Sequence, residues 1–80
     1  MEESLKSDTL LDVTGLSCPL PIIRIKHAMG QIAVGAVLEV WTTDPGSLTD
    51  IPAWAHTTGQ ELVHVIADAP PFKFWIRRAH

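Results

Sequence analysis

The segment Gly15-Leu16-Ser17-Cys18-Pro19-Leu20-Pro21 fixes where a strand must end and a helix must begin, and it holds the only cysteine in the sequence. Gly15 supplies the backbone freedom that a tight strand-to-helix turn needs. Prolines are tolerated in the first turn of a helix, because their missing N–H groups would have no partner within the helix there. We therefore predict Cys18 as the N-cap of a helix that runs from residue 19 to about residue 33.

This position also predicts a reactive thiol. The N-terminus of a helix carries partial positive charge, which favours the thiolate form of a cysteine. Because Pro19 and Pro21 lack N–H groups, the amide of Leu20 is the one first-turn donor left to point at the sulfur. We expect a pKa for Cys18 below the value of roughly 8.5 of a free cysteine. A lone cysteine is more often a buried apolar residue, but a turn between prolines is a poor place for a core side chain.

Hydrophobic periodicity gives the remaining elements. Residues 9–13, 36–42, 61–67 and 72–77 are predicted strands, and the last two are joined by the turn at residues 68–71. In the first helix an apolar stripe is predicted to face the sheet: Ile22, Ile25, Ala28, Met29 and Ile32.

The second helix follows the turn at residues 43–46. Ser47 and Asp50 have the spacing of a capping box, although Pro52 is also compatible with a start nearer Asp50 or with a kink. Its inner face is predicted to carry Leu48, Ile51, Ala55 and Thr58, with Trp54 at the edge and Gly59 as the C-terminal cap.

The order βαβαββ predicts an α/β fold, a two-layer sandwich of two helices on a four-stranded sheet. Eighty residues allow one domain, which we expect over residues 9–80, after a flexible tail at residues 1–8. The sheet would then keep one open face. Trp41 and Trp75 would lie on this face. If they are exposed, they form an apolar patch that favours weak self-association or a partner contact; the alternative is that Val37, Val63 or Val65 shields them.

Composition excludes several classes of function. The formal net charge of −3 argues against a protein that binds nucleic acids or anionic membranes. One cysteine excludes an intrachain disulfide, and the histidines lack metal-ligand spacing. We expect no metal and no cofactor. Neither a signal peptide nor a membrane-spanning run is visible, so we expect a cytoplasmic protein.

The run from Leu11 to Pro21, followed by Lys26, resembles the Cys-Pro-x-Pro signature of the TusA/SirA family of small sulfur carriers. The stretches at residues 43–52 and 72–77 are also similar to that family, in its order and spacing. The resemblance implies a mixed sheet with both helices on one face. It also implies a sulfurtransferase in which Cys18 accepts sulfane sulfur as a persulfide and passes it to an acceptor thiol.

The resemblance implies protein partners on both sides of the transfer. The donor would be a cysteine desulfurase or a rhodanese-like protein, and the acceptor would serve tRNA thiolation, molybdenum cofactor assembly or an oxidative sulfur relay. The carrier itself would be a monomer or a weak dimer. The alternative is a non-catalytic interaction or regulatory module that uses the open sheet face.

Further residues are assigned from the helix pattern and the resemblance. Leu20, Arg24 and His27 form an exposed stripe beside Cys18, which we expect to dock partners. Lys26 matches a basic position of the family and either supports the thiolate or packs at the rim of the buried face. Asp12 and Asp44 match acidic positions, for which we favour hydrogen bonding in turns. The chain departs from the pattern at Leu20, where tRNA-thiolation carriers have glutamate, and at Ala55, where some members have a second cysteine.

Overall fold

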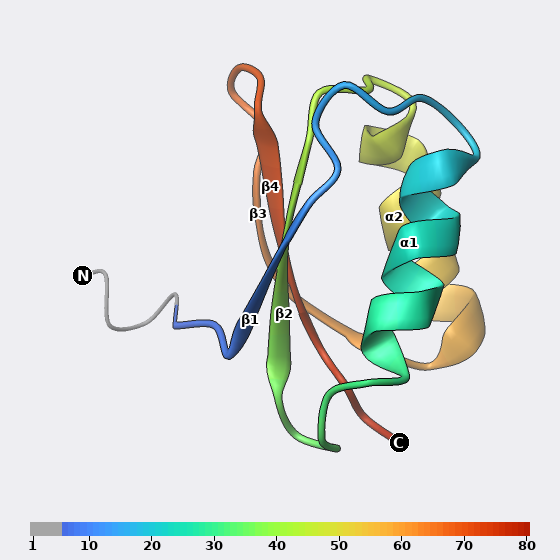
Figure 1. The fold of residues 1–80 in the computed structure, drawn as a ribbon, viewed down its shortest axis with the longest axis vertical. Helices are drawn as coiled ribbons and strands as arrows, with labels where there is room; N and C mark the ends of the chain where they lie inside the picture. The colour runs from blue at the N-terminus through green and yellow to red at the C-terminus, as the bar shows by residue number, and fades with distance from the viewer. Residues whose placement is uncertain (1–5) are drawn as a thin grey trace.

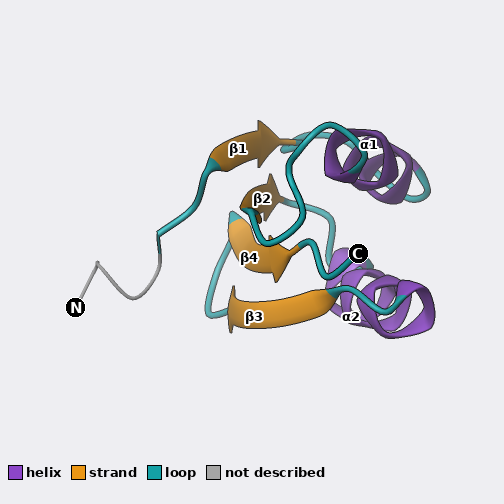
Figure 2. Ribbon diagram, turned by 90° about the horizontal axis from the view of Figure 1, so that it is seen from below, coloured by secondary structure: helices purple, strands orange, loops and turns teal. Residues whose placement is uncertain are grey.

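The computed structural model describes residues 6–80, which form four strands and two helices in the order predicted from the sequence. The strands are β1 (Thr9–Asp12), β2 (Val37–Thr42), β3 (Glu61–Ile66) and β4 (Phe72–Arg77), and the helices are α1 (Leu20–Met29) and α2 (Ser47–Thr58). Both helices lie on the same side of the sheet, which leaves its other face without a covering layer (Figures 1 and 2). The α/β two-layer sandwich is confirmed.

The sheet is mixed, with strand order β1-β2-β4-β3. β1 pairs with β2 in parallel, and β4 pairs antiparallel with both β2 and β3. Parallel neighbours need a crossover connection, and α1 provides it between β1 and β2. The carboxyl ends of β1 and β2 therefore meet at one edge of the sheet. This edge positions the candidate site.

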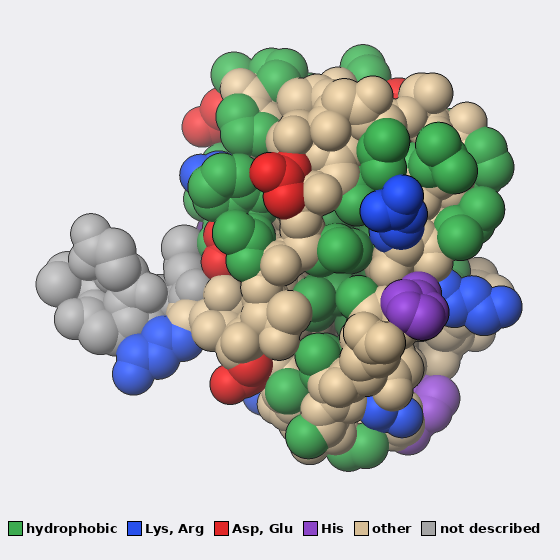
Figure 3. Space-filling model, in the orientation of Figure 1, with side chains coloured by type: hydrophobic (Ala, Val, Ile, Leu, Met, Phe, Trp, Pro, Cys, Tyr) green, Lys and Arg blue, Asp and Glu red, His purple; other side chains and the backbone are tan. Residues whose placement is uncertain are grey.

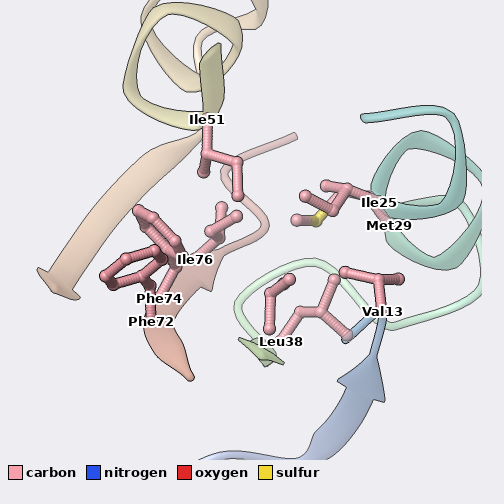
Figure 4. Close-up of a cluster of buried hydrophobic side chains, with 9 residues drawn as sticks. Val13, Ile25, Met29, Leu38, Ile51, Phe72, Phe74 and Ile76 are labelled. Carbon is pink, nitrogen blue, oxygen red and sulfur yellow. The ribbon is translucent and has the colours of Figure 1, made fainter. Parts of the chain in front are cut away.

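The core lies between the sheet and the helices (Figure 4). Alternate residues of β2 and β4 face the helices and are fully or nearly fully buried: Leu38, Val40, Phe72, Phe74 and Ile76. Ile25 and Met29 from α1, Ile51 and Ala55 from α2, and Val13 after β1 also belong to this core. Both predicted helix faces are thus confirmed, because the apolar stripes meet the inward side of the strands.

The end of α1 and the start of α2 differ from the expectation. α1 ends at Met29 instead of near residue 33. α2 begins at Ser47 and continues through Pro52, but the capping box is not formed. Ser47 instead directs its hydroxyl to that of buried Thr42, 3.1 Å away. Gly59 ends α2 in the left-handed conformation, as predicted, with φ of 77°.

The open face of the sheet is less exposed than expected. Trp75 is only 5% exposed, and its indole packs edge-on against His64 with 5.5 Å between ring centroids. Trp41 is half-buried, with the amino group of Lys73 4.5 Å from its ring centroid. The prediction of an exposed tryptophan patch is therefore wrong for Trp75, because neighbouring side chains on the same face cover it.

The amino-terminal segment is partly held by the sheet. Asp8 accepts a hydrogen bond from the amide of Val37 and donates its own amide to the Val37 carbonyl. The hydroxyl of Ser7 donates to Glu39 at 2.8 Å. Ser7 and Asp8 thus contact β2, although the sequence places them in a flexible tail. Residues 1–5 of that tail lie outside the described residues.

Candidate functional site

Cys18 lies in the loop that connects β1 to α1, which we call the Cys18 loop (residues 13–19). The thiol is exposed, as the sequence predicts. Gly15 takes the left-handed conformation with φ of 84°, which confirms the role expected for this glycine. The loop brings Cys18 to the sheet edge where the parallel strands β1 and β2 end.

The start of α1 differs from the prediction. Pro19, not Cys18, is the N-cap residue, and Leu20 is the first residue of the helix. The amide of Leu20 donates to the carbonyl of Ser17 at 3.0 Å instead of pointing at the sulfur. The peptide bond between Cys18 and Pro19 is cis. The thiol therefore stands before the first helical turn, and the expected amide–sulfur contact is absent.

A second segment completes the site. The turn between β2 and α2, which we call the Asp44 turn (residues 43–46), lies against the Cys18 loop. The carboxylate of Asp44 accepts a hydrogen bond from the Cys18 amide at 3.0 Å. The hydroxyl oxygen of Thr43 accepts one from the Gly15 amide at 2.8 Å. Two of the three stretches that resemble the family pattern thus form one site.

Carboxylates dominate the electrostatics around the sulfur. Hydrogen bonding to the Asp50 carboxylate, partial loss of hydration, and the negative charges of Asp50 and Asp44 raise the pKa of Cys18 above its ordinary value. The prediction of a lowered pKa is therefore wrong. Its physical reason is that two nearby carboxylates outweigh the end of a helix that begins after Pro19.

Asp50 is a candidate site residue that the sequence did not assign to the site. The spacing from Ser47 suggested a capping role, but Asp50, in the first turn of α2, contributes most to raising the pKa of Cys18. The signal that could have placed Asp50 near Cys18 is the topology of the fold. Residues that follow two adjacent parallel strands meet at the carboxyl edge of the sheet, as ligand sites do in open α/β sheets.

The three charged candidates from the sequence have different surroundings. Asp12 accepts bonds from the amide and hydroxyl of Thr14, which lower the pKa of Asp12 and confirm its role in the turn. Asp44 also bonds its own turn, through Gly46 N–H at 3.2 Å, as predicted. Lys26 is not among the groups that shift the pKa of Cys18. It lines a groove of about 560 Å³ between α1 and α2, with Ile22 and Trp54.

The predicted docking stripe is exposed on α1. Leu20 is 44% exposed, and the side chains of Arg24 and His27 are also exposed. Ile23, on the same exposed side of the helix, adds further apolar surface. In Figure 3 the Lys, Arg and His side chains lie mostly over the α1 side of the molecule, and most Asp and Glu side chains lie towards the sheet. No helix in residues 6–80 is long and apolar enough to cross a membrane.

Comparison with known proteins identifies the family. The family model described as sulfurtransferase TusA matches residues 9–78. The chain is 42% identical over 74 residues to the putative sulfur carrier protein YrkI of Bacillus subtilis, covering 92% of this chain and 99% of that one. It is 43% identical over 72 residues to the sulfur carrier protein TusA of Allochromatium vinosum, covering 90% and 95% of the two chains.

A solved structure supports the fold. The crystal structure of a SirA-like protein from Desulfitobacterium hafniense superposes with a TM-score of 0.76 at 23% identity, covering 90% of this chain and 99% of that one. The resemblance that the Cys-Pro-x-Pro signature suggested is thus confirmed by the family match and by the relatives. The chain belongs to the TusA family of sulfurtransferases.

Proposed function

We propose that this protein is a sulfur carrier that accepts sulfane sulfur as a persulfide on Cys18 and delivers it to an acceptor protein. The observation that carries the proposal is the exposed thiol at the carboxyl edge of the two parallel strands. The relatives named sulfur carrier proteins support it. An exposed sulfur suits transfer between proteins, because both partners must reach it in turn.

The chemistry is sulfur exchange without net oxidation. The Cys18 thiolate attacks the terminal sulfur of a donor persulfide, the donor's S–S bond breaks, and the donor leaves as a thiolate while Cys18–S–SH forms. An acceptor thiolate then attacks the terminal sulfur on Cys18. The Cys18–sulfur bond breaks, and the Cys18 thiolate is regenerated. Each step breaks one S–S bond and forms one, so the protein acts as a sulfurtransferase.

The raised pKa of Cys18 has two opposing effects on this exchange. It lowers the thiolate fraction at neutral pH, and it makes the thiolate, once formed, a stronger nucleophile but a poorer leaving group. The smaller thiolate fraction is expected to slow sulfur uptake at neutral pH, and the poorer leaving group to slow sulfur release to small thiols. We infer that a protein partner, by pairing with the carboxylates near the sulfur, speeds the transfer. A carrier with this property keeps its sulfur for its partners.

The donor and acceptor stay proposals. The donor would be a cysteine desulfurase or a rhodanese-like protein. The acceptor would serve tRNA thiolation, cofactor assembly or an oxidative relay. Both would bind at the exposed stripe Leu20, Arg24 and His27. A reducing compartment such as the cytoplasm would preserve the free thiol. The alternative, a non-catalytic module that uses the open sheet face, is not favoured, because Trp75 is buried there.

Intact-mass measurement tests the proposal. The protein is incubated with a rhodanese that has been loaded from thiosulfate, and the parent is expected to gain one sulfur atom that a reducing thiol removes. Cys18→Ser is expected to fold normally, since the side chain is exposed, and to gain none. A parent that stays unmodified, or equal uptake by Cys18→Ser, would overturn the proposal.

A further inference from the structure

We propose that Asp44 is a positioning residue for the transferring sulfur, because its carboxylate holds the backbone of Cys18 against the Asp44 turn. The inference rests on the sulfur-carrier function proposed above. It assigns to Asp44 a role in that reaction beyond bonding within its own turn.

The first observation is the geometry of the carboxylate. Its Oδ2 accepts the Cys18 amide at 3.0 Å, and its Oδ1 accepts the Gly46 amide at 3.2 Å. The two oxygens therefore join two loops that are far apart in the sequence. Hydrogen bonds from backbone amides to a carboxylate are of the stronger, charge-assisted kind. The neighbouring Thr43 bonds the Gly15 amide, so the Cys18 loop is held at two points by consecutive residues.

The second observation is that the Asp44 turn is itself fixed to the core. Thr42 and Ser47 flank the turn and are the buried polar residues of the part of the chain that the structure describes. Their hydroxyl oxygens are 3.1 Å apart, and the Thr42 hydroxyl oxygen accepts the Asp44 amide at 3.1 Å. Buried hydroxyl groups are costly unless they are hydrogen-bonded. A continuous hydrogen-bonded path thus runs from the core to the backbone of Cys18.

Fixed placement matters more for transfer between proteins than for reaction with a small reagent. A docked donor holds its persulfide in one orientation, and a misplacement of about 1 Å can slow such a reaction about a hundredfold. A small alkylating reagent approaches the exposed thiol from many directions. Loss of the Asp44 carboxylate should therefore slow sulfur uptake from a protein donor while leaving the alkylation of the ionised thiol unchanged.

The experiment compares Asp44→Ala, Asp44→Asn and Asp12→Ala. Asp12 is the matched control, because its carboxylate also accepts two hydrogen bonds at the end of β1, both from Thr14 and neither from Cys18. Asp44→Ala is expected to slow uptake from loaded rhodanese at least about tenfold, and Asp12→Ala less than about twofold. Asp44→Asn is expected to restore most of the rate, since its amide oxygen can still accept the Cys18 amide.

Alkylation by iodoacetamide distinguishes a loss of positioning from a change in the intrinsic reactivity of the thiol. At a pH where the thiol is fully ionised, all three variants are expected to react like the parent. At neutral pH Asp44→Asn is expected to react faster than the parent, because it retains the hydrogen bond without the charge. The role is overturned if Asp44→Ala takes up sulfur no more slowly than Asp12→Ala, or if Asp44→Asn is as slow as Asp44→Ala.

Hydrogen exchange of the Cys18 amide, followed by NMR, separates this inference from the proposed function. Exchange should become faster in Asp44→Ala and stay unchanged in Asp12→Ala. If the parent takes up no sulfur but this difference is seen, the carrier function fails and the structural hold stands. If Asp44→Ala does not fold, Thr43→Val carries the test. It should expose the Gly15 amide to exchange and slow uptake by a smaller factor, and a parent-like result in both measurements would overturn the role.

Discussion

The charges around Cys18 decide how this residue reacts. The sequence argument gave the greatest weight to the helix N-terminus, but the effect of a helix end falls off within its first turn. Here the helix begins after Pro19, whereas Asp50 and Asp44 lie near the thiol. Carboxylates favour the protonated thiol. The reactive thiolate is therefore a minor form at neutral pH, and the pH dependence of its reactions reports on these neighbours.

The alkylation of Cys18 should show this dependence. The rate with iodoacetamide is expected to rise with pH through a midpoint above that of a free cysteine, because the folded environment raises the pKa of the thiol. Asp50→Asn should move the midpoint down and speed alkylation severalfold at neutral pH, since it removes a negative charge and replaces a charged hydrogen-bond acceptor with a neutral one. Alkylation rates measured by stopped flow or mass spectrometry over a pH series give the midpoint of the parent and that of Asp50→Asn.

Asp68→Asn is the control for this prediction. Asp68 is exposed in the β3–β4 connection and is not among the groups that shift the pKa of Cys18. Its substitution should leave the profile unchanged. A parent midpoint at or below that of free cysteine, or an Asp50→Asn profile that coincides with the parent's, would show that the carboxylates do not control the thiol.

At the scale of the element, α1 combines a buried face with an exposed face suited to docking. α1 contains no acidic residue, and Leu20, Arg24 and His27 are exposed on it. An apolar side chain next to a cation is a common composition for a small binding surface. Leu20→Glu and Arg24→Glu should each change the free energy of unfolding by less than about 0.5 kcal/mol, as surface substitutions usually do. Each should slow sulfur transfer with at least one protein partner.

Val34→Glu provides the matched comparison for Leu20→Glu. Val34 is also apolar and is 62% exposed, but it lies beyond the end of α1 that is farthest from Cys18 along the helix. Transfer rates with each donor and acceptor are measured for all three variants. If Leu20→Glu and Arg24→Glu exchange sulfur at the parent rate with every partner tested, the stripe is only solvated surface.

The glycines that follow the two helices give a second prediction, on stability. Gly59 caps α2 with φ of 77°, and a Cβ there would meet the His80 ring at 3.0 Å. Gly59→Ala should therefore destabilise the protein by about 1 to 2 kcal/mol. Gly30 has helical dihedrals, and a Cβ there would make only ordinary contacts, so Gly30→Ala should be neutral or stabilise by up to about 1 kcal/mol. Urea unfolding measures the free energy of unfolding of both variants. Equal changes in Gly59→Ala and Gly30→Ala would contradict the prediction.

Periodicity predicted the elements well because it reports on burial. Strand β4 and the inner faces of both helices follow from alternating and helical apolar patterns, which the core enforces. The capping box failed because α2 begins at Ser47 with Gly46 as its N-cap, and the Ser47 hydroxyl lies beside that of Thr42, which is adjacent only in the folded chain. The same limit applies to the site. Cys18 was evident from its local setting, but its bond to Asp44 depends on the parallel pairing of β1 with β2.

Across the whole molecule, the open sheet face has no covering layer but holds one nearly buried side chain, that of Trp75. Trp75 projects from β4 away from the helices, opposite Glu39 of β2 and His64 of β3. It is nevertheless almost fully buried. The sheet therefore gains stability from both faces, and the exposed apolar patch that favoured self-association is reduced. Exposed apolar surface remains on the outer side of α1, at Leu20 and Ile23.

Substitution of Trp75 tests this view of the open face. Its indole N–H is buried and has no hydrogen-bond partner among residues 6–80. Trp75→Ala should lower the free energy of unfolding by about 3 to 5 kcal/mol, the usual cost of removing a large buried aromatic side chain. Trp75→Phe should cost much less, because it retains an aromatic ring against His64 and removes a buried donor whose lack of a partner costs about 1 to 3 kcal/mol.

Urea unfolding followed by far-ultraviolet circular dichroism compares the two variants with the parent. Trp41→Ala is the control from the same face, since Trp41 is only half-buried and its loss should cost less than that of Trp75. If Trp75→Ala left stability within about 0.5 kcal/mol of the parent, the side chain would behave as a surface residue. If Trp75→Phe were as damaging as Trp75→Ala, shape complementarity at the indole would outweigh the unpaired donor, and the ranking of these two effects would be reversed.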